Sequence, residues 1–177
     1  MQGPIGGRSS NPEASAMSQQ TNTIDERRRL PQRWAEEVHG KHNLDFIDEY
    51  HAPDWVGHFD GETLTNAEYK DMQRQLTSGF PDAEFVFGPV IVEGEMVAGH
   101  WAMTGTHTGD FAGIKPTNET VHVTGTFVTR YDDEGRALET WENIDQFGML
   151  QQLGIAPEEF TASGLLRTAV NLVKNGI

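Results

Sequence analysis

The chain has 177 residues, enough for one domain with a buried core, and its lack of cysteine excludes disulfide bonds, thiolate metal sites and thiol nucleophiles. Its formal net charge of −14 disfavours contact with the phosphate backbone of nucleic acids. No apolar stretch has the length of a transmembrane helix or the pattern of a signal peptide, so we expect a cytoplasmic protein with no nucleic-acid or membrane partner.

The N-terminal segment, residues 1–23, is rich in Ser, Gln, Asn, Gly and Pro and has no regular spacing of apolar residues. Such a composition is typical of a chain that cannot bury enough apolar surface to fold. We therefore predict a disordered leader over residues 1–23 and a single domain over residues 24–177, with a C-terminal helix from about residue 157.

The first part of the domain is predicted to be helical. Leu30, Trp34 and Val38 recur every four residues, which favours an amphipathic helix that ends near Gly40. A shorter helix with apolar residues at helical spacing is predicted to end at Tyr50. A brief extended piece follows it.

A third helix and several strands come next. Thr65 and Glu68 have the spacing of a capping box, which marks the start of the third helix. Beyond it, two β-rich runs flank Glu93-Gly94-Glu95, which predicts a hairpin, and further strands are predicted over residues 120–131 and 137–145. Helices that precede antiparallel strands make an α+β fold. We predict a cone-shaped barrel, in which a curved antiparallel sheet wraps around the N-terminal helices and leaves a small-molecule pocket between them.

The last predicted strand carries polar side chains at alternating positions. Successive side chains of a strand point to opposite faces, so the strand divides into two sets. The two sets are Trp141, Asn143 and Asp145 on one face and Thr140, Glu142 and Ile144 on the other. An aromatic wall, an amide and a carboxylate on one face favour a polar cavity, where burial raises the pKa of a carboxylate toward that of a general acid or base. The spacing agrees equally well with Asp145 as the N-cap of a helix that begins at Gln146.

Histidines and tryptophans are the other candidates for a site. The histidines in or near the predicted sheet are His58, His100, His107 and His122. None has the spacing of a helical metal-binding pair, so we expect no metal. His58 is either a pocket donor or a surface residue. The tryptophans, Trp34 among them, are core residues by default, but any two on the inner face would stack against a flat ligand.

Three stretches of the sequence resemble one known family. They are FPD at residues 80–82, WAMTGTHTGDFAGIKPT at residues 101–117 and WENIDQFGMLQQLG at residues 141–154. Together they are similar to the SnoaL-like polyketide cyclase (ester cyclase) family, and the similarity runs from about Leu30 to Gly154.

The resemblance implies a fold, an activity and residues that carry it. The fold would be the cone-shaped α+β barrel of the nuclear-transport-factor-like (cystatin-like) superfamily, usually dimeric through the sheet. The founding cyclases of the family close a ring of an anthracycline precursor by intramolecular aldol condensation, without metal or cofactor, and use a carboxylate as acid and base. The matching aspartate is Asp145, and His58 matches a histidine that would line the pocket.

We therefore predict a cofactor-free cyclase or isomerase for a small hydrophobic or polyketide-like carbonyl substrate, with Asp145 and His58 as catalytic residues. The predicted substrate-binding residues are Asn143, Trp141, Trp34 and His107. The alternative is a non-catalytic binder of a small hydrophobic ligand on the same fold. The outward face of the sheet should carry apolar residues, Val128 among the candidates, and should pair two copies into a homodimer.

Overall fold

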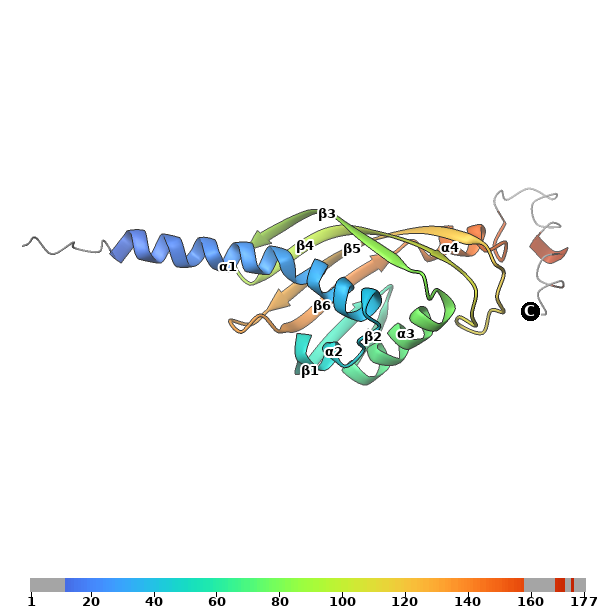
Figure 1. The fold of residues 1–177 in the computed structure, drawn as a ribbon, viewed down its shortest axis with the longest axis horizontal. Helices are drawn as coiled ribbons and strands as arrows, with labels where there is room; N and C mark the ends of the chain where they lie inside the picture. The colour runs from blue at the N-terminus through green and yellow to red at the C-terminus, as the bar shows by residue number, and fades with distance from the viewer. Residues whose placement is uncertain (1–11, 158–167, 171–172, 174–177) are drawn as a thin grey trace, which may run out of the picture.

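The computed structural model describes residues 12–157, 168–170 and 173, with side chains from Ile24 onward. Within them, one curved sheet of six strands, in the order β2-β1-β6-β5-β4-β3, is covered on its concave side by helices (Figure 1). The elements are α1 (Pro12–Ala35), the π-helix η1 (Glu36–Gly40), α2 (Phe46–Tyr50), β1 (His51–Phe59), β2 (Glu62–Leu64), α3 (Asn66–Gly79), β3 (Glu84–Glu93), β4 (Met96–Thr106), β5 (Thr120–Tyr131), β6 (Ala137–Ile144) and α4 (Gln146–Gln152). The predicted α+β cone is confirmed.

The first helical segment begins earlier than expected and ends where predicted. α1 begins at Pro12, within residues 1–23, and at Glu36 it changes to a π-helix that ends at Gly40. The wider turn carries Val38 and His39 inward, and both are buried. Single π-helical turns of this kind are frequent at functional sites.

The third helix begins as predicted. The Thr65 side chain accepts a hydrogen bond from the backbone N–H of Glu68, and the Glu68 carboxylate accepts one from the backbone of Thr65. The helix predicted from about residue 157 lies outside the described residues, apart from the short pieces at 168–170 and 173. Of the helices that the structure describes, none is long and apolar enough to cross a membrane.

The strand β1 corrects the predicted sheet. Residues 51–59, expected as a brief extended piece, form a full strand that pairs in parallel with β6 and antiparallel with β2. Parallel strands cannot be joined by a tight turn, and these two are far apart in the sequence. No local sequence pattern therefore predicts that they pair. The sheet is therefore mixed, and β1 brings α2 and α3, which both contact it, against the concave face.

The strand β5 divides the sheet into two faces. The odd-numbered residues from Val121 to Tyr131 are buried on the concave side, and the even-numbered residues point away from it. The predicted hairpin before β5 is confirmed, since β3 ends and β4 begins on either side of a turn in which Gly94 has a φ of 57°. The concave face is the one that the helices cover.

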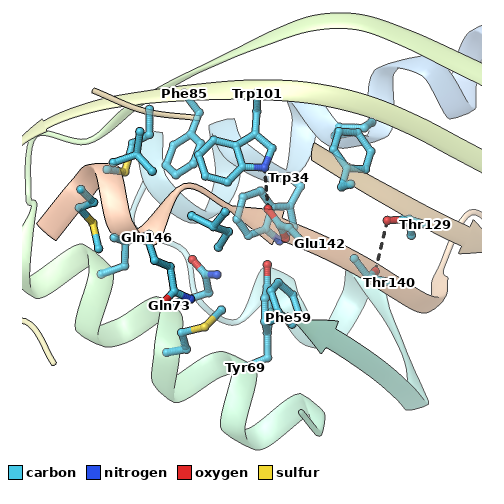
Figure 2. A pocket seen from close by; sticks show the side chains of 18 of the residues that line it. Trp34, Phe59, Tyr69, Gln73, Phe85, Trp101, Thr129, Thr140, Glu142 and Gln146 are labelled. Atoms are coloured by element: carbon cyan, nitrogen blue, oxygen red, sulfur yellow. Dashed lines mark hydrogen bonds between the residues drawn. The ribbon is translucent and has the colours of Figure 1, made fainter. Parts of the chain in front are cut away.

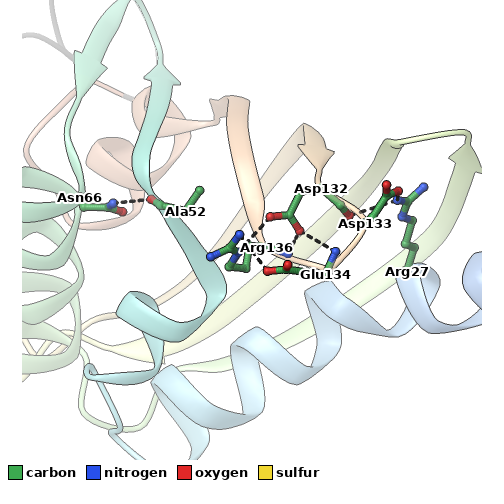
Figure 3. Close-up of polar contacts among 7 residues, drawn as sticks. All are labelled: Arg27, Ala52, Asn66, Asp132, Asp133, Glu134 and Arg136. Carbon is green, nitrogen blue, oxygen red and sulfur yellow. Dashed lines mark hydrogen bonds and ion pairs between the residues drawn. The ribbon is translucent and has the colours of Figure 1, made fainter.

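The turn between β5 and β6 is held by Asp132. One carboxylate oxygen of Asp132 accepts hydrogen bonds from the backbone N–H groups of Glu134 and Arg136, and the other accepts one from the Arg136 guanidinium at 2.9 Å (Figure 3). Arg27 of α1 donates to the backbone carbonyl of Asp132 at 3.1 Å. The turn is thus tied both to itself and to the first helix.

A β-bulge follows this turn and sets the direction of β6. Tyr131 pairs with Ala137, but its neighbour Arg130 pairs with Glu139, which leaves Leu138 as an extra residue on β6. Because side chains alternate along a strand, a shift of one residue reverses the face of every residue that follows. The bulge therefore decides which set of β6 side chains points into the cone.

Candidate functional site

A cavity of about 500 Å³ lies between the concave face of the sheet and the helices, a size typical of small-molecule sites. Its wall is largely aromatic. The aromatic residues that line it are Trp34, Tyr50, Trp55, Phe59, Tyr69, Phe85, Phe87, Trp101, Phe111, Phe127 and Tyr131. Within the described part of the chain, Glu142 is the only carboxylate among the lining residues.

Glu142 reaches this cavity from β6 and is held there by Trp101 of β4. The strand β5 lies between them, where Trp101 pairs with Gly125. A Cβ atom at Gly125 would overlap the indole ring, so the missing side chain lets the indole cross β5. Its Nε1–H then donates to Glu142 Oε1 at 2.6 Å (Figure 2). Glu142 Oε2 accepts no hydrogen bond from the described residues and stays available to a ligand.

The surroundings of Glu142 give it the pKa of a group that exchanges protons near neutral pH. Burial raises the pKa of Glu142 to about 7, the hydrogen bond from Trp101 opposes the rise, and the charge of Asp60 adds to it. The side chain keeps some accessible surface, but it lines the cavity, so we take that surface to face the cavity rather than bulk water. The surrounding protein still desolvates the charge.

Two polar side chains of α3 lie on the opposite wall. The Tyr69 hydroxyl points toward Glu142, and Gln73 follows one helical turn later on the same side (Figure 2). Burial first, and the charge of Glu142 second, raise the pKa of Tyr69 well above its ordinary value, so its hydroxyl stays a neutral donor.

Other polar groups of the wall are already paired. The hydroxyls of Tyr50 and Tyr131 share a hydrogen bond, and those of Thr129 and Thr140 lie 3.2 Å apart. The Nε1–H of Trp55 donates to Thr140 at 3.2 Å. Because these groups already hydrogen-bond to one another, they stabilise the wall and have little hydrogen-bonding capacity left for a ligand.

His51 is a neutral, buried part of the wall. The side-chain NH₂ of Asn66 donates to the carbonyl oxygen of Ala52 at 2.8 Å (Figure 3). The Asn66 amide oxygen therefore faces His51 Nδ1 and accepts a hydrogen bond from it at 2.7 Å. The proton therefore sits on Nδ1, and Nε2 is the acceptor. Burial lowers the pKa of His51 to about 4, so it carries no charge at neutral pH.

Asp145, the predicted acid and base, lies outside the cavity. It is exposed at the N-terminus of α4, where its Oδ1 accepts a hydrogen bond from the backbone N–H of Gly148 at 2.9 Å. This is the N-cap geometry that the sequence left as the alternative. The geometric reason is the bulge at Leu138, which turns Trp141, Asn143 and Asp145 outward and Thr140, Glu142 and Ile144 inward.

The other predicted residues of β1 and β6 also lie on the outer face. His58 stacks on Trp141 with ring centroids 5.5 Å apart and pairs with Glu139 at 3.1 Å. The Asn143 amide donates to Asp60 at 3.3 Å and so helps to hold the end of β1. The structure thus brings His58 and Trp141 together, but on the side of the sheet away from the cavity.

The last two predicted residues differ in their positions. Trp34 lines the cavity. His107 does not line it but is fully buried against Phe80, with ring centroids 5.1 Å apart, and its Nδ1 contacts the Thr117 hydroxyl at 3.1 Å. Among the described residues, no group of three or more His, Cys, Asp and Glu side chains is arranged to hold a metal ion.

Four residues of the site were not predicted from the sequence: Glu142, Tyr69, Gln73 and Trp101. The sequence places Glu142 on the face of its strand opposite to the predicted catalytic face, and only the register of β6 on β5 shows that the face of Glu142 is the inner one. Phe127 pairs with Glu142, and Phe127 belongs to the apolar set of β5. The strict alternation of β5 was therefore a usable signal, but the turn length alone does not reveal the extra residue in β6.

The fold and the cavity define a class of mixed α+β proteins built around an internal small-molecule site. Over residues 29–153 the sequence matches the model of the SnoaL-like polyketide cyclase family. The chain belongs to this family, as its three motifs predicted. A search of curated proteins gives no match.

Several solved structures share the fold. AclR, a candidate hydroxylase from Streptomyces galilaeus, is 25% identical over 76% of this chain and 99% of its own, with a TM-score of 0.69. A candidate polyketide cyclase from Acidithiobacillus ferrooxidans is 28% identical over 71% of this chain and 92% of its own, with a TM-score of 0.62. IdmH, a candidate polyketide cyclase from Streptomyces antibioticus, is 27% identical over 68% of this chain and 93% of its own, with a TM-score of 0.60.

Proposed function

We propose that this protein is an acid/base enzyme of the cyclase or isomerase type, in which Glu142 moves a proton on a carbonyl substrate held in the cavity. The observation that carries the proposal is a carboxyl with a pKa raised to about 7, in an aromatic cavity and oriented by Trp101 at 2.6 Å. A general acid or base works best when its pKa lies near the working pH. The family relationship and the names of two relatives agree with this reaction class.

The proposed reaction uses Glu142 twice. The ionised carboxylate removes a proton from the carbon next to a carbonyl, and the electron pair of the broken C–H bond moves onto the carbonyl oxygen. The Tyr69 hydroxyl, which points toward Glu142, donates to this enolate oxygen. The enolate carbon then attacks a second carbonyl of the same molecule and forms a C–C bond. Protonated Glu142 returns its proton to the new alkoxide, so the product has the mass of the substrate.

The substrate class follows from the wall. Aromatic side chains on all sides favour a flat, conjugated molecule, because they offer stacking and edge contacts. A cavity of about 500 Å³ holds a molecule of several fused rings or an uncyclised chain of similar volume. We therefore propose a polyketide-like carbonyl compound as substrate.

The experiment is turnover by wild type, Glu142→Gln and Asp145→Asn on a panel of aromatic poly-β-ketone analogues, followed by mass spectrometry. We expect a product of unchanged mass, or of that mass less one water, and a loss of about 10²–10⁴ in rate for Glu142→Gln. Asp145→Asn, the matched carboxylate outside the cavity, should keep a rate within a few-fold of wild type.

Other outcomes point elsewhere. A product heavier by one oxygen would indicate hydroxylation, the activity in the name of AclR. A ligand that binds equally well to wild type and Glu142→Gln and is never converted would identify a binder without catalysis. Either result, or full activity in Glu142→Gln, would refute the proposed role of Glu142.

A further inference from the structure

Two buried polar atoms in the cavity wall have no partner. The Oε1 of Gln73 and the Nε1–H of Trp34 are both buried, and neither makes a hydrogen bond within the described residues. Both residues line the cavity, and Gln73 is only 5% exposed. A buried polar group without a partner destabilises the protein, so an unpaired donor and an unpaired acceptor in a cavity wall are expected to bind a ligand.

The two atoms belong to one cluster of side chains. The ring of Trp34 lies 6.3 Å from that of Tyr69, and Gln73 follows Tyr69 by one turn of α3. His39, on the π-helical turn, packs edge-on against Trp34 with centroids 5.2 Å apart. Hydrogen bonding with the Gln73 side chain raises the pKa of His39 and lowers that of Tyr69, against the larger effect of burial on each. Neither Gln73 Oε1 nor His39 Nε2, however, makes a hydrogen bond of normal distance and angle.

Two unpartnered atoms of the cluster belong to residues that line the cavity, and they are one donor and one acceptor; a third, His39 Nε2, belongs to a residue that does not line it. An indole N–H only donates, and the carbonyl oxygen of an amide only accepts. Burial lowers the pKa of His39 to about 4, so the cluster is uncharged at neutral pH and a neutral ligand group fits it better than an ion. The group that satisfies both atoms at once is a hydroxyl, whose oxygen accepts from Trp34 and whose hydrogen is donated to Gln73.

We propose that Trp34 and Gln73 form a hydroxyl-binding subsite, and that the protein selects carbonyl compounds that also carry a hydroxyl or enol group. The subsite deepens the proposed function, because it lies in the same cavity as Glu142 and orients the molecule on which Glu142 acts (Figure 2). A site that pairs buried polar atoms with a substrate hydroxyl rejects the analogue without it far more strongly than an apolar pocket could.

The test compares two flat probes of similar shape, 2-naphthol and 2-methylnaphthalene, by calorimetric titration. We expect wild type to bind 2-naphthol about tenfold more tightly. Gln73→Met, which keeps the length of the side chain, and Trp34→Phe, which keeps its ring, should each bring the ratio close to one. Met72→Leu, on the same helix and in the same wall, is the matched control and should keep the wild-type ratio. Thermal melting checks that each variant folds.

A second readout follows the indole N–H signals of the four tryptophans by nuclear magnetic resonance. Trp34→Phe removes one signal and so assigns it, and 2-naphthol alone should move that signal downfield. Equal affinities for the two probes in wild type, no binding of either, or a ratio that survives in both Gln73→Met and Trp34→Phe would overturn the subsite. So would a ratio lost only in Glu142→Gln, because the carboxyl would then bind the hydroxyl. The role of Glu142 as base is tested by turnover, so the two proposals can fail separately.

Discussion

The two faces of β6 carry the same kinds of group and give them opposite environments. Glu142 on the inner face lies in an aromatic cavity, and burial raises its pKa to about 7. Asp145, three residues later and on the outer side, is exposed and caps a helix. The difference teaches that a carboxylate becomes a candidate acid or base through desolvation and a fixed partner, and not through its place in a motif.

Activity measurements test the difference between Glu142 and Asp145 most directly. Glu142→Gln should lower the rate on any identified substrate by about 10²–10⁴, because it removes the proton acceptor and keeps the shape. Asp145→Asn should stay within a few-fold of wild type. The measurement is kcat with saturating substrate for both variants. The reverse order of the two effects would return the role to Asp145.

The pH dependence of stability tests whether the Glu142 carboxyl is desolvated. The pKa of Glu142 is raised from 4.5 to about 7, so the folded state binds more protons than the unfolded state between these values, and stability falls as pH rises through this window. Glu142→Gln lacks this loss and should be more stable than wild type by up to about 3 kcal/mol at pH 8, with little difference near pH 4.

Urea unfolding at several pH values measures this difference. Glu62→Gln, an exposed change of the same charge on β2, is the control and should keep the wild-type dependence on pH. A Glu142→Gln variant whose stability runs parallel to wild type from pH 4 to 8 would mean that the carboxyl is not desolvated.

The outer face of the sheet also predicts that two copies of the chain form a dimer. Ile91, Ala98, Val128 and Trp141 pair in register and form one row across β3, β4, β5 and β6. Ile91 is 67% exposed, and Val128 and Trp141 are 37% and 38% exposed. We propose that two copies pair through this row, since an exposed apolar patch on a sheet favours a partner.

Val128→Lys should weaken this dimer at least about tenfold, as the loss of about 1.4 kcal/mol would do. Gln75→Lys, on the exposed side of α3, is the control and should leave the dimer intact. Light scattering at several salt concentrations measures the mass, and association should tighten as salt screens the charge of −14 on each chain. A monomer at micromolar concentration in high salt would contradict the dimer.

The smallest effect concerns the cap. Asp145→Ala removes the acceptor of the Gly148 N–H and should lower the free energy of unfolding by about 1 kcal/mol. Asp145→Ser, which keeps an acceptor at the cap, should recover most of it. No change in either variant would show that α4 does not depend on this hydrogen bond.

The sequence by itself determined the local structure and the family. The spacing of Leu30, Trp34 and Val38, the capping box at Thr65 and the hairpin at Gly94 are local patterns, and each lies in the element it predicted. The division of β6 into two sets was also correct, because alternation is a property of any strand. The motifs identified the family over most of the folded chain.

Only the tertiary structure decided which set of β6 residues meets the substrate. The bulge at Leu138 depends on how β6 pairs with β5, and the parallel pairing of β1 joins segments far apart in sequence. The contact of Trp101 with Glu142 needs three strands side by side and the empty position at Gly125. Such relations are set by long-range register and by the closing of the cone, which no local spacing contains.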